Sequence, residues 1–217
     1  SNLYDLPFGT AGGHYFYGCM CYEQNDLVAA EDHFIQVLQN RYHVNAQLVI
    51  HSILGLASIY QVRGLPDKAL EMTATANTFL LEIQNIAQSP LVQAFQLHLA
   101  LWQNQEVEAR QWLAAINVDA LFQTMSNFYS PAITYGRLLL AQKQWVQATA
   151  YLNRLQQFLE SIHNTRFLME TLVLQSLLYQ FQGEEQTART HLVRAVMLAA
   201  PSRFIRLFAN YFSELSP

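Results

Sequence analysis

Residues 56–70 read LASIYQVRGLPDKAL, and the pattern in this stretch decides the fold. Gly64 stands between two helix-forming segments, and glycine readily adopts the left-handed backbone conformation that ends helices. Pro66 follows at a position typical of the first turn of a helix, where the missing N–H costs little. The small residues Ala57 and Ala69 suit a close crossing of two helices. The stretch therefore predicts an antiparallel helix pair that turns at Gly64.

Alanines at positions equivalent to Ala69 recur along the chain about every 40 residues. A residue that can end a helix stands five positions before each of these alanines, and most of these residues are Gly or Asn. The alanines are Ala30, Ala69, Ala109, Ala148 and Ala188, and the corresponding stops are Asn25, Gly64, Asn104, Lys143 and Gly183. Self-similarity at a fixed period predicts a stacked repeat architecture, in which each repeat packs on its neighbours.

A stripe of apolar or small side chains follows each alanine at i+4 and i+7, which is one face of an α-helix. Its members are Phe34 and Val37, Thr73 and Ala76, Leu113 and Ile116, Leu152 and Leu155, and Leu192 and Ala195. We predict an all-α fold, namely a right-handed superhelical solenoid of antiparallel helix pairs, with five pairs and a C-terminal capping helix that starts at Pro201. In the first pair, Gly18 should let the two helices approach closely.

Prolines, glycines and caps set the boundaries of the repeats. Residues 1–13 are rich in glycine and contain a proline, so we expect an irregular lead-in there and a repeat domain over residues 14–217. Ser89-Pro90 and Ser130-Pro131 each predict an N-cap followed by proline at the first helical position. We also expect the chain to be a piece of a longer protein.

Composition restricts the classes of partner. Charged residues make up 13% of the 217 residues, against about 25% in average proteins. Either some surface is covered by other domains, a partner or a second copy, or the composition is simply rich in Gln. The net charge of −4 argues against a non-specific nucleic-acid surface. The basic residues Arg189, Arg194, Arg203 and Arg206 are interpreted as ordinary helix-face charge.

The two cysteines and the apolar segments indicate a reducing, aqueous location. Cys19 and Cys21 point to nearly opposite sides of a helix, so they can neither bridge each other nor jointly hold a metal. Two free thiols are typical of the cytosol. The longest uncharged run, residues 44–62, contains several polar side chains and is interpreted as a buried helix of the solenoid rather than a membrane span. We therefore expect a cytoplasmic protein with no membrane contact.

Signatures of catalysis are lacking in the sequence. The seven histidines include no pair with the HExxH spacing of zinc proteases, and no Gly-x-Ser-x-Gly elbow occurs. Neither Lys68 nor Lys143 follows a glycine, so a phosphate-binding loop of the Gly-Lys-Ser/Thr type is excluded. We expect a protein that is not an enzyme, with no catalytic residues, no cofactor and no metal.

The first helices of the pairs should line the concave wall of the superhelix, and side chains that point there are candidate ligand or partner contacts. The repeat register selects Tyr15, Tyr22, His51, Gln61, Phe95, His98, Trp102 and Arg137. Aromatic rings could stack on a sugar or a peptide while polar groups bond its edges. His98, Trp102 and Arg137 are the strongest candidates. The alternative is that Tyr15, Phe95 and Trp102 simply pack between helices.

Three stretches carry a resemblance to a known family. Residues 57–69, ASIYQVRGLPDKA, resemble a tetratricopeptide (TPR) repeat, although the period here is longer than the 34 residues of TPR proper. Residues 106–116 read EVEARQWLAAI, and residues 195–208 read AVMLAAPSRFIRLF. Together with the long TPR-like period, they resemble the helical repeat region of the large ATP-dependent LuxR-type transcription regulators, which include the maltose regulator.

This resemblance implies a sensing role in bacteria. The family's ATPase switch and helix-turn-helix DNA reader are not visible in this sequence. The resemblance therefore implies the helical middle region, which responds to a small-molecule inducer such as a sugar, or to a regulatory protein. Other domains of the same full-length chain and self-association are further expected contacts, and direct nucleic-acid contact is not expected. The alternative is a generic TPR-like scaffold that binds a peptide segment in its groove.

Overall fold

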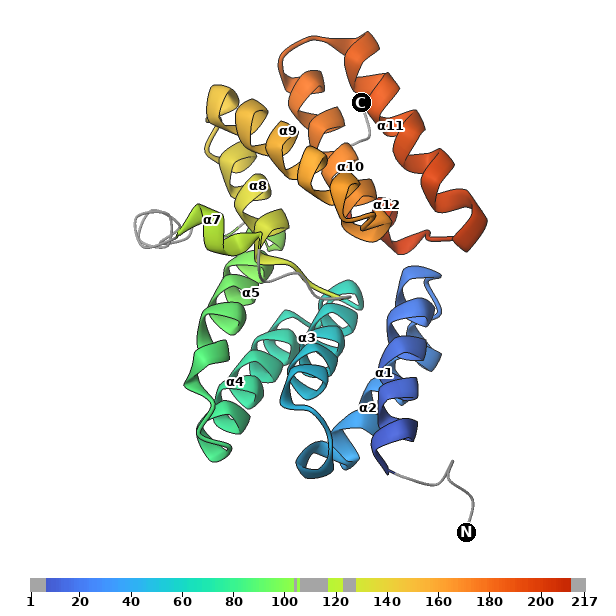
Figure 1. Cartoon of the computed structure of the whole chain (residues 1–217), viewed down its shortest axis with the longest axis vertical. Helices are drawn as coiled ribbons and strands as arrows, with labels where there is room; N and C mark the ends of the chain where they lie inside the picture. The colour runs from blue at the N-terminus through green and yellow to red at the C-terminus, as the bar shows by residue number, and fades with distance from the viewer. Residues whose placement is uncertain (1–6, 104, 106–116, 123–127, 212–217) are drawn as a thin grey trace. The chain divides into compact units, whose positions relative to one another are not determined.

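The computed structural model describes residues 7–103, 105, 117–122 and 128–211 (Figure 1). Within this part of the chain, the regular structure is entirely helical, which confirms the predicted all-α repeat fold. The chain divides into two compact units, Ser1–Gln103 and Asn104–Pro217. We describe each unit by itself.

Unit 1 contains two complete helix pairs and one further helix, and consecutive helices pack against each other along the chain (Figure 1). The first helices α1, α3 and α5 also contact one another in that order. The helices are α1 (Pro7–Glu23), α2 (Leu27–Gln39), α3 (Ala46–Val62), α4 (Pro66–Glu82) and α5 (Ser89–Trp102), with short 3-10 turns at Arg41–His43 and Ile86–Gln88.

Phe34 of α2 is the centre of the unit 1 core. It is fully buried, and its ring lies between two glycines, Gly18 of α1 and Gly55 of α3. A Cβ atom at Gly18 would lie 2.7 Å from the ring, and one at Gly55 would lie 2.5 Å from it. Gly18 therefore allows the close approach that the sequence predicts. The equivalent role of Gly55 is found only in the structure.

Unit 2 continues the same repeat. A short helix, α7 (Val118–Leu121), comes first in its described part. The pairs that follow are α8 (Pro131–Ala141) with α9 (Trp145–Ser161), and α10 (Thr165–Phe181) with α11 (Glu185–Ala199). A 3-10 turn, Ala200–Ser202, leads to α12 (Arg206–Ala209). Ala148, Leu152 and Leu155 of the predicted stripe are fully buried between these helices.

The predicted helix stops adopt the left-handed conformation. Asn25, Gly64, Lys143 and Gly183 have φ values of 66°, 72°, 57° and 78°. Asn104, Ala109, Leu113 and Ile116 lie outside the described residues, as does the 106–116 stretch. Gln84 and His163 are also left-handed, with φ of 53° and 54°, where a second helix ends and the next pair begins. These two turns were not predicted, because Gln and His carry no turn signal.

The beginnings of the helices differ in part from prediction. α1 begins at Pro7, so residues 7–13, expected to be irregular, are helical. Proline is tolerated at the first helical position, and Ala11 and Tyr15 anchor this turn in the core. Ser130 is the expected N-cap and accepts a hydrogen bond from the Ala132 N–H. The N-cap at Ser89 is wrong, because Gln88 occupies that position and Ser89 is already helical.

The predicted capping helix from Pro201 is interrupted. Arg203 adopts a left-handed conformation, with φ of 54°, and separates the 3-10 turn from α12. Neither Cys19 nor Cys21 forms a disulfide bond with a residue that the structure describes. Within the described residues, no helix combines the length and the apolar character that crossing a membrane requires.

Candidate functional site

Seven of the eight predicted contact residues lie in unit 1, on the first helices of its repeats. Tyr15 and Tyr22 belong to α1, His51 and Gln61 to α3, and Phe95, His98 and Trp102 to α5. The first helices contact one another, so the predicted register places these residues on one connected layer of the unit. Arg137 is on α8 of unit 2. The layer divides into a buried part and a more accessible end.

The buried part consists of Tyr15, Tyr22, His51 and Phe95. Tyr15, His51 and Phe95 are each 1% exposed, and the Tyr15 and His51 ring centroids are 6.5 Å apart. Burial lowers the pKa of His51 to about 4, so its ring is neutral near pH 7. In this structure these four side chains are buried, and for Tyr15 and Phe95 packing between helices is the alternative that the sequence leaves open. Their contact with a ligand stays a prediction.

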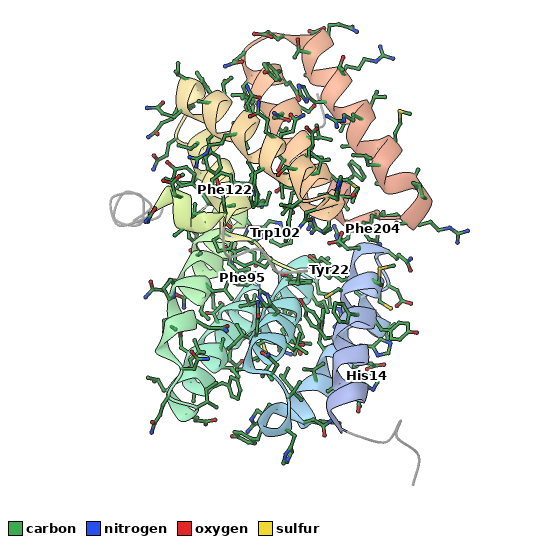
Figure 2. The ribbon with its side chains drawn as sticks, viewed as in Figure 1. His14, Tyr22, Phe95, Trp102, Phe122 and Phe204 are labelled. Carbon is green, nitrogen blue, oxygen red and sulfur yellow. The ribbon has the colours of Figure 1, made fainter. Side chains whose placement is uncertain are left out.

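The accessible end follows one face of α5. The Phe95 and His98 rings stack with centroids 5.6 Å apart, and the Trp102 indole meets His98 edge-on at 5.6 Å. Figure 2 labels Phe95 and Trp102, the two ends of this row. Burial decreases along this row, because Phe95 is fully covered, His98 is 9% exposed and Trp102 is only half-buried. The row therefore presents its aromatic surface at the C-terminal end of α5.

Two glutamine side chains complete this end of the layer. The Gln103 Nε2 donates a hydrogen bond to Gln61 Oε1 at 2.8 Å, which joins the end of α5 to the end of α3. Both side chains are half-buried, like that of the neighbouring Trp102. An indole beside two amides offers an apolar face with polar groups at its edge, which is the usual composition of a small binding site. We call Gln61, His98, Trp102 and Gln103 the α3–α5 rim.

Gln103 is the member that sequence reasoning missed. It follows directly after α5 and serves as its C-cap, so the register of the first helices did not include it. The hydrogen bond across to Gln61 reveals it, and a glutamine next to a candidate tryptophan was the only available signal in the sequence.

Arg137 belongs to a different and largely enclosed group. Its guanidinium carbon lies 4.7 Å from the centre of the Tyr211 ring, and its side chain is 7% exposed. The Tyr211 hydroxyl donates to Glu170 Oε1 at 2.8 Å, and Arg166 Nη1 donates to Glu170 Oε2 at 2.9 Å. The segment after α12 thus covers Arg137. We call Arg137, Arg166, Glu170 and Tyr211 the charged cluster.

The polar and aromatic side chains described above could recognise a molecule by its shape and its hydrogen-bonding groups. Within the part of the chain that the structure describes, no three His, Cys, Asp or Glu side chains come together in a way that could hold a metal ion. The α3–α5 rim supplies amide donors and acceptors together with an indole face. The charged cluster supplies two guanidinium cations and a carboxylate, whose partners are already in place.

Comparison with known proteins identifies the family. The model of the MalT-like TPR region matches residues 8–211, which is nearly the whole chain and includes both units. Searches of curated proteins and of solved structures gave no match. The match agrees with the repeat of about 40 residues and with the helix pairs of both units. The chain belongs to the family of MalT-like TPR regions.

Proposed function

We propose that this chain is the sensing region of a LuxR-type ATP-dependent transcription regulator and that it binds a small inducer, such as a sugar, at the α3–α5 rim. Membership in the family of MalT-like TPR regions supports the regulatory role. The observation that carries the site is the half-buried Trp102 indole beside the hydrogen-bonded Gln61 and Gln103 amides. In this proposal the domain recognises a molecule and catalyses no reaction.

The chemistry of the rim fits a carbohydrate. A sugar ring has apolar C–H faces that pack on an indole, and hydroxyl edges that pair with amide groups. Gln61 and Gln103 already bond each other, so a bound hydroxyl would exchange one amide partner for another rather than bury an unpaired group. His98 supports Trp102 from behind, since the two rings are in contact.

The test is calorimetric titration of the chain with a panel of mono- and oligosaccharides. We expect at least one sugar to bind wild type, and Trp102→Ala to weaken it about tenfold, because the stacking surface is lost. Gln61→Ala should weaken the same sugar by less. Trp145→Ala is the matched control, since Trp145 is also half-buried but lies in unit 2 against Phe181. Absence of binding by every sugar, or equal weakening by the control, would contradict the proposal.

The second candidate function is a scaffold that binds an extended peptide at the same rim, which the paired Gln61 and Gln103 amides also favour, since they can bond a peptide backbone. A pull-down with wild type and Trp102→Ala separates the two. A protein that is lost with Trp102→Ala, in the absence of sugar binding, would favour the scaffold. The regulator assignment itself is tested by the complete gene, in which we expect a phosphate-binding loop upstream and a helix-turn-helix segment downstream.

A further inference from the structure

The end of α11 and the segment that follows it line an open apolar hollow of about 470 Å³. Its lining includes Val196 and Ala199 of α11 together with Phe204, Ile205 and Phe208 from the residues that follow. Figure 2 shows Phe204 beside the end of α11. Arg203 is the charged member of this lining, and its left-handed backbone ends the 3-10 turn Ala200–Ser202 between α11 and Phe204. The hollow therefore lies within unit 2 and depends on the turn at Arg203.

The repeat register shows that the α11 surface next to the hollow is both apolar and exposed, whereas the equivalent Ile35 and Leu38 of α2 are apolar but half-buried, and the equivalents in α4 and α9 are polar or small. The positions five, eight and nine residues after the repeat alanine are Val193, Val196 and Met197 in α11, Asn153, Gln156 and Gln157 in α9, and Ala74, Asn77 and Thr78 in α4. The three α11 side chains are 48%, 48% and 70% exposed. A repeat face that is polar or small in α4 and α9 is thus large and apolar in α11. Exposed apolar surface of this kind indicates an interaction site.

Basic side chains surround this apolar surface. Arg194 is neutralised by Glu160 at 2.7 Å, and Arg206 donates from Nε to Asn210 at 2.8 Å. Arg189 and Arg203 are exposed and form no ion pair with any residue that the structure describes. Arg203 in the lining of the hollow, with Arg189 about two helical turns before Val196 on α11, favours a partner that carries carboxylates next to an apolar stripe.

We propose that this surface, the α11 groove, binds an amphipathic helix of a partner protein. The α11 groove comprises Val193, Val196, Met197, Arg203, Phe204 and Ile205. The apolar stripe of the partner helix enters the hollow, and its acidic flank faces Arg203 and Arg189. A helix fits better than a lipid surface, because an apolar hollow can take up the projecting side chains of a helix, whereas a flat membrane surface would leave it unfilled.

The experiment uses two fluorescein-labelled helical peptides of about 18 residues, long enough to form a helix on binding. Both carry leucines at i, i+3, i+4 and i+7. One has glutamates on the flanks, and the other has lysines there. Binding to the whole chain is followed by fluorescence anisotropy, and circular dichroism checks that each variant is folded. We expect the glutamate peptide to bind wild type more tightly than the lysine peptide.

Three variants test the location. Val196→Glu and Met197→Glu should each weaken the glutamate peptide about tenfold or more, since a carboxylate replaces apolar contact and repels the acidic flank. Val146→Glu is the matched control, because Val146 is 82% exposed on α9 and should have no effect. Arg203→Glu should weaken the glutamate peptide about threefold and strengthen the lysine peptide, which only a direct charge contact explains.

Four outcomes would overturn the proposal. They are failure of the glutamate peptide to bind, an equal loss in Val146→Glu, no shift of affinity from the glutamate peptide toward the lysine peptide in Arg203→Glu, and occupation of the groove by another partner. The last is checked in two ways. Cosedimentation with anionic phosphatidylserine vesicles that is lost in Met197→Glu would assign the surface to membranes. A dimer in light scattering that Met197→Glu converts to monomer would assign it to a second copy.

Discussion

The two units hold their first helices together by different means. In unit 1, the Phe34 ring fills the space left by Gly18 and Gly55, so the core shared by α1, α2 and α3 is apolar, while the polar contacts His14–His33 and Arg63–Glu31 link these helices outside that core. In unit 2, the same repeat position carries Leu152, which lies near Gly136, and the charged cluster adds a second link between α8, α10 and the segment after α12. The same repeat pattern thus supports a core in unit 1 that depends on side-chain volume and a core in unit 2 that also depends on paired charges.

This difference follows from what each core position can tolerate. A close-packed ring between two glycines leaves no room for an added methyl group and leaves a cavity when it is removed. A largely buried carboxylate with two donors is stable only while both donors remain, since an uncompensated buried charge is costly. Substitutions that change side-chain volume should therefore test the core of unit 1, and substitutions that remove a buried charge should test the core of unit 2.

The largest expected effect is at Phe34. Phe34→Ala should lower the free energy of unfolding by about 3–5 kcal/mol, because it removes a fully buried ring and leaves a cavity between two glycines that cannot fill it. Urea denaturation measures this loss. Phe16→Ala, on the same hairpin but 52% exposed, is the control and should change stability by less than about 0.5 kcal/mol. A loss below about 1 kcal/mol at Phe34 would show that unit 1 does not depend on this ring.

The second effect is at Glu170 in the charged cluster. Glu170→Gln should cost about 2 kcal/mol, because Arg166 loses its carboxylate partner in a largely buried setting while the Tyr211 hydroxyl keeps an acceptor. Glu160→Gln removes the exposed pair with Arg194 and should cost well under about 1 kcal/mol. Urea denaturation compares the two variants. Equal costs would mean that burial does not strengthen the cluster.

The third effect concerns pH and His51. Its pKa in the folded state, about 4, lies below the unfolded value of about 6.5, so the unfolded chain binds more protons in acid. Its contribution to stability is complete above pH 6.5 and is lost, at up to about 1.4 kcal/mol per pH unit, as the pH falls toward 4. His51→Leu should remove this part of the acid sensitivity, as measured by urea denaturation at pH 7 and pH 5. His43→Leu, at an exposed site, is the control. An unchanged acid sensitivity in His51→Leu would disprove the assignment.

The smallest effect compares the hairpin turns. Gly64 in unit 1 and Lys143 in unit 2 occupy equivalent left-handed positions. Gly64→Ala should cost about 1 kcal/mol, since a Cβ disfavours this conformation, and Lys143→Gly should stabilise by up to about 1 kcal/mol. Thermal denaturation measures both changes. The same sign in both variants would mean that the turn conformation does not control stability.

The features that the sequence predicted well are local. The turns at Gly64 and Gly183, the stripe through Ala148, Leu152 and Leu155, and the N-cap at Ser130 depend on residues within a few positions of one another. The features that it missed depend on distant partners. Gln84 and His163 turn left-handed without a turn signal, because the next helix must pack back on the previous pair.

The candidate site shows the same division. Sequence register placed Gln61 and Trp102 on neighbouring first helices, and the structure adds Gln103 through a hydrogen bond between residues far apart in the chain. Arg137 was predicted from its own helix, but Tyr211, near the other end of unit 2, covers its guanidinium. A side chain on a helix has a predictable direction, whereas the group that it meets there depends on the packing of other helices.

The sequence by itself determined the helix pairs, their period and the family, because backbone preferences and apolar spacing act over a few residues and repeat along the chain. Only the tertiary structure decided which faces are covered. Phe34 sits between glycines of two different helices, and α11 leaves a large apolar face and a hollow exposed. The physical reason is that burial is a property of neighbours brought together in space, and side-chain size and charge decide the outcome only once those neighbours are in place.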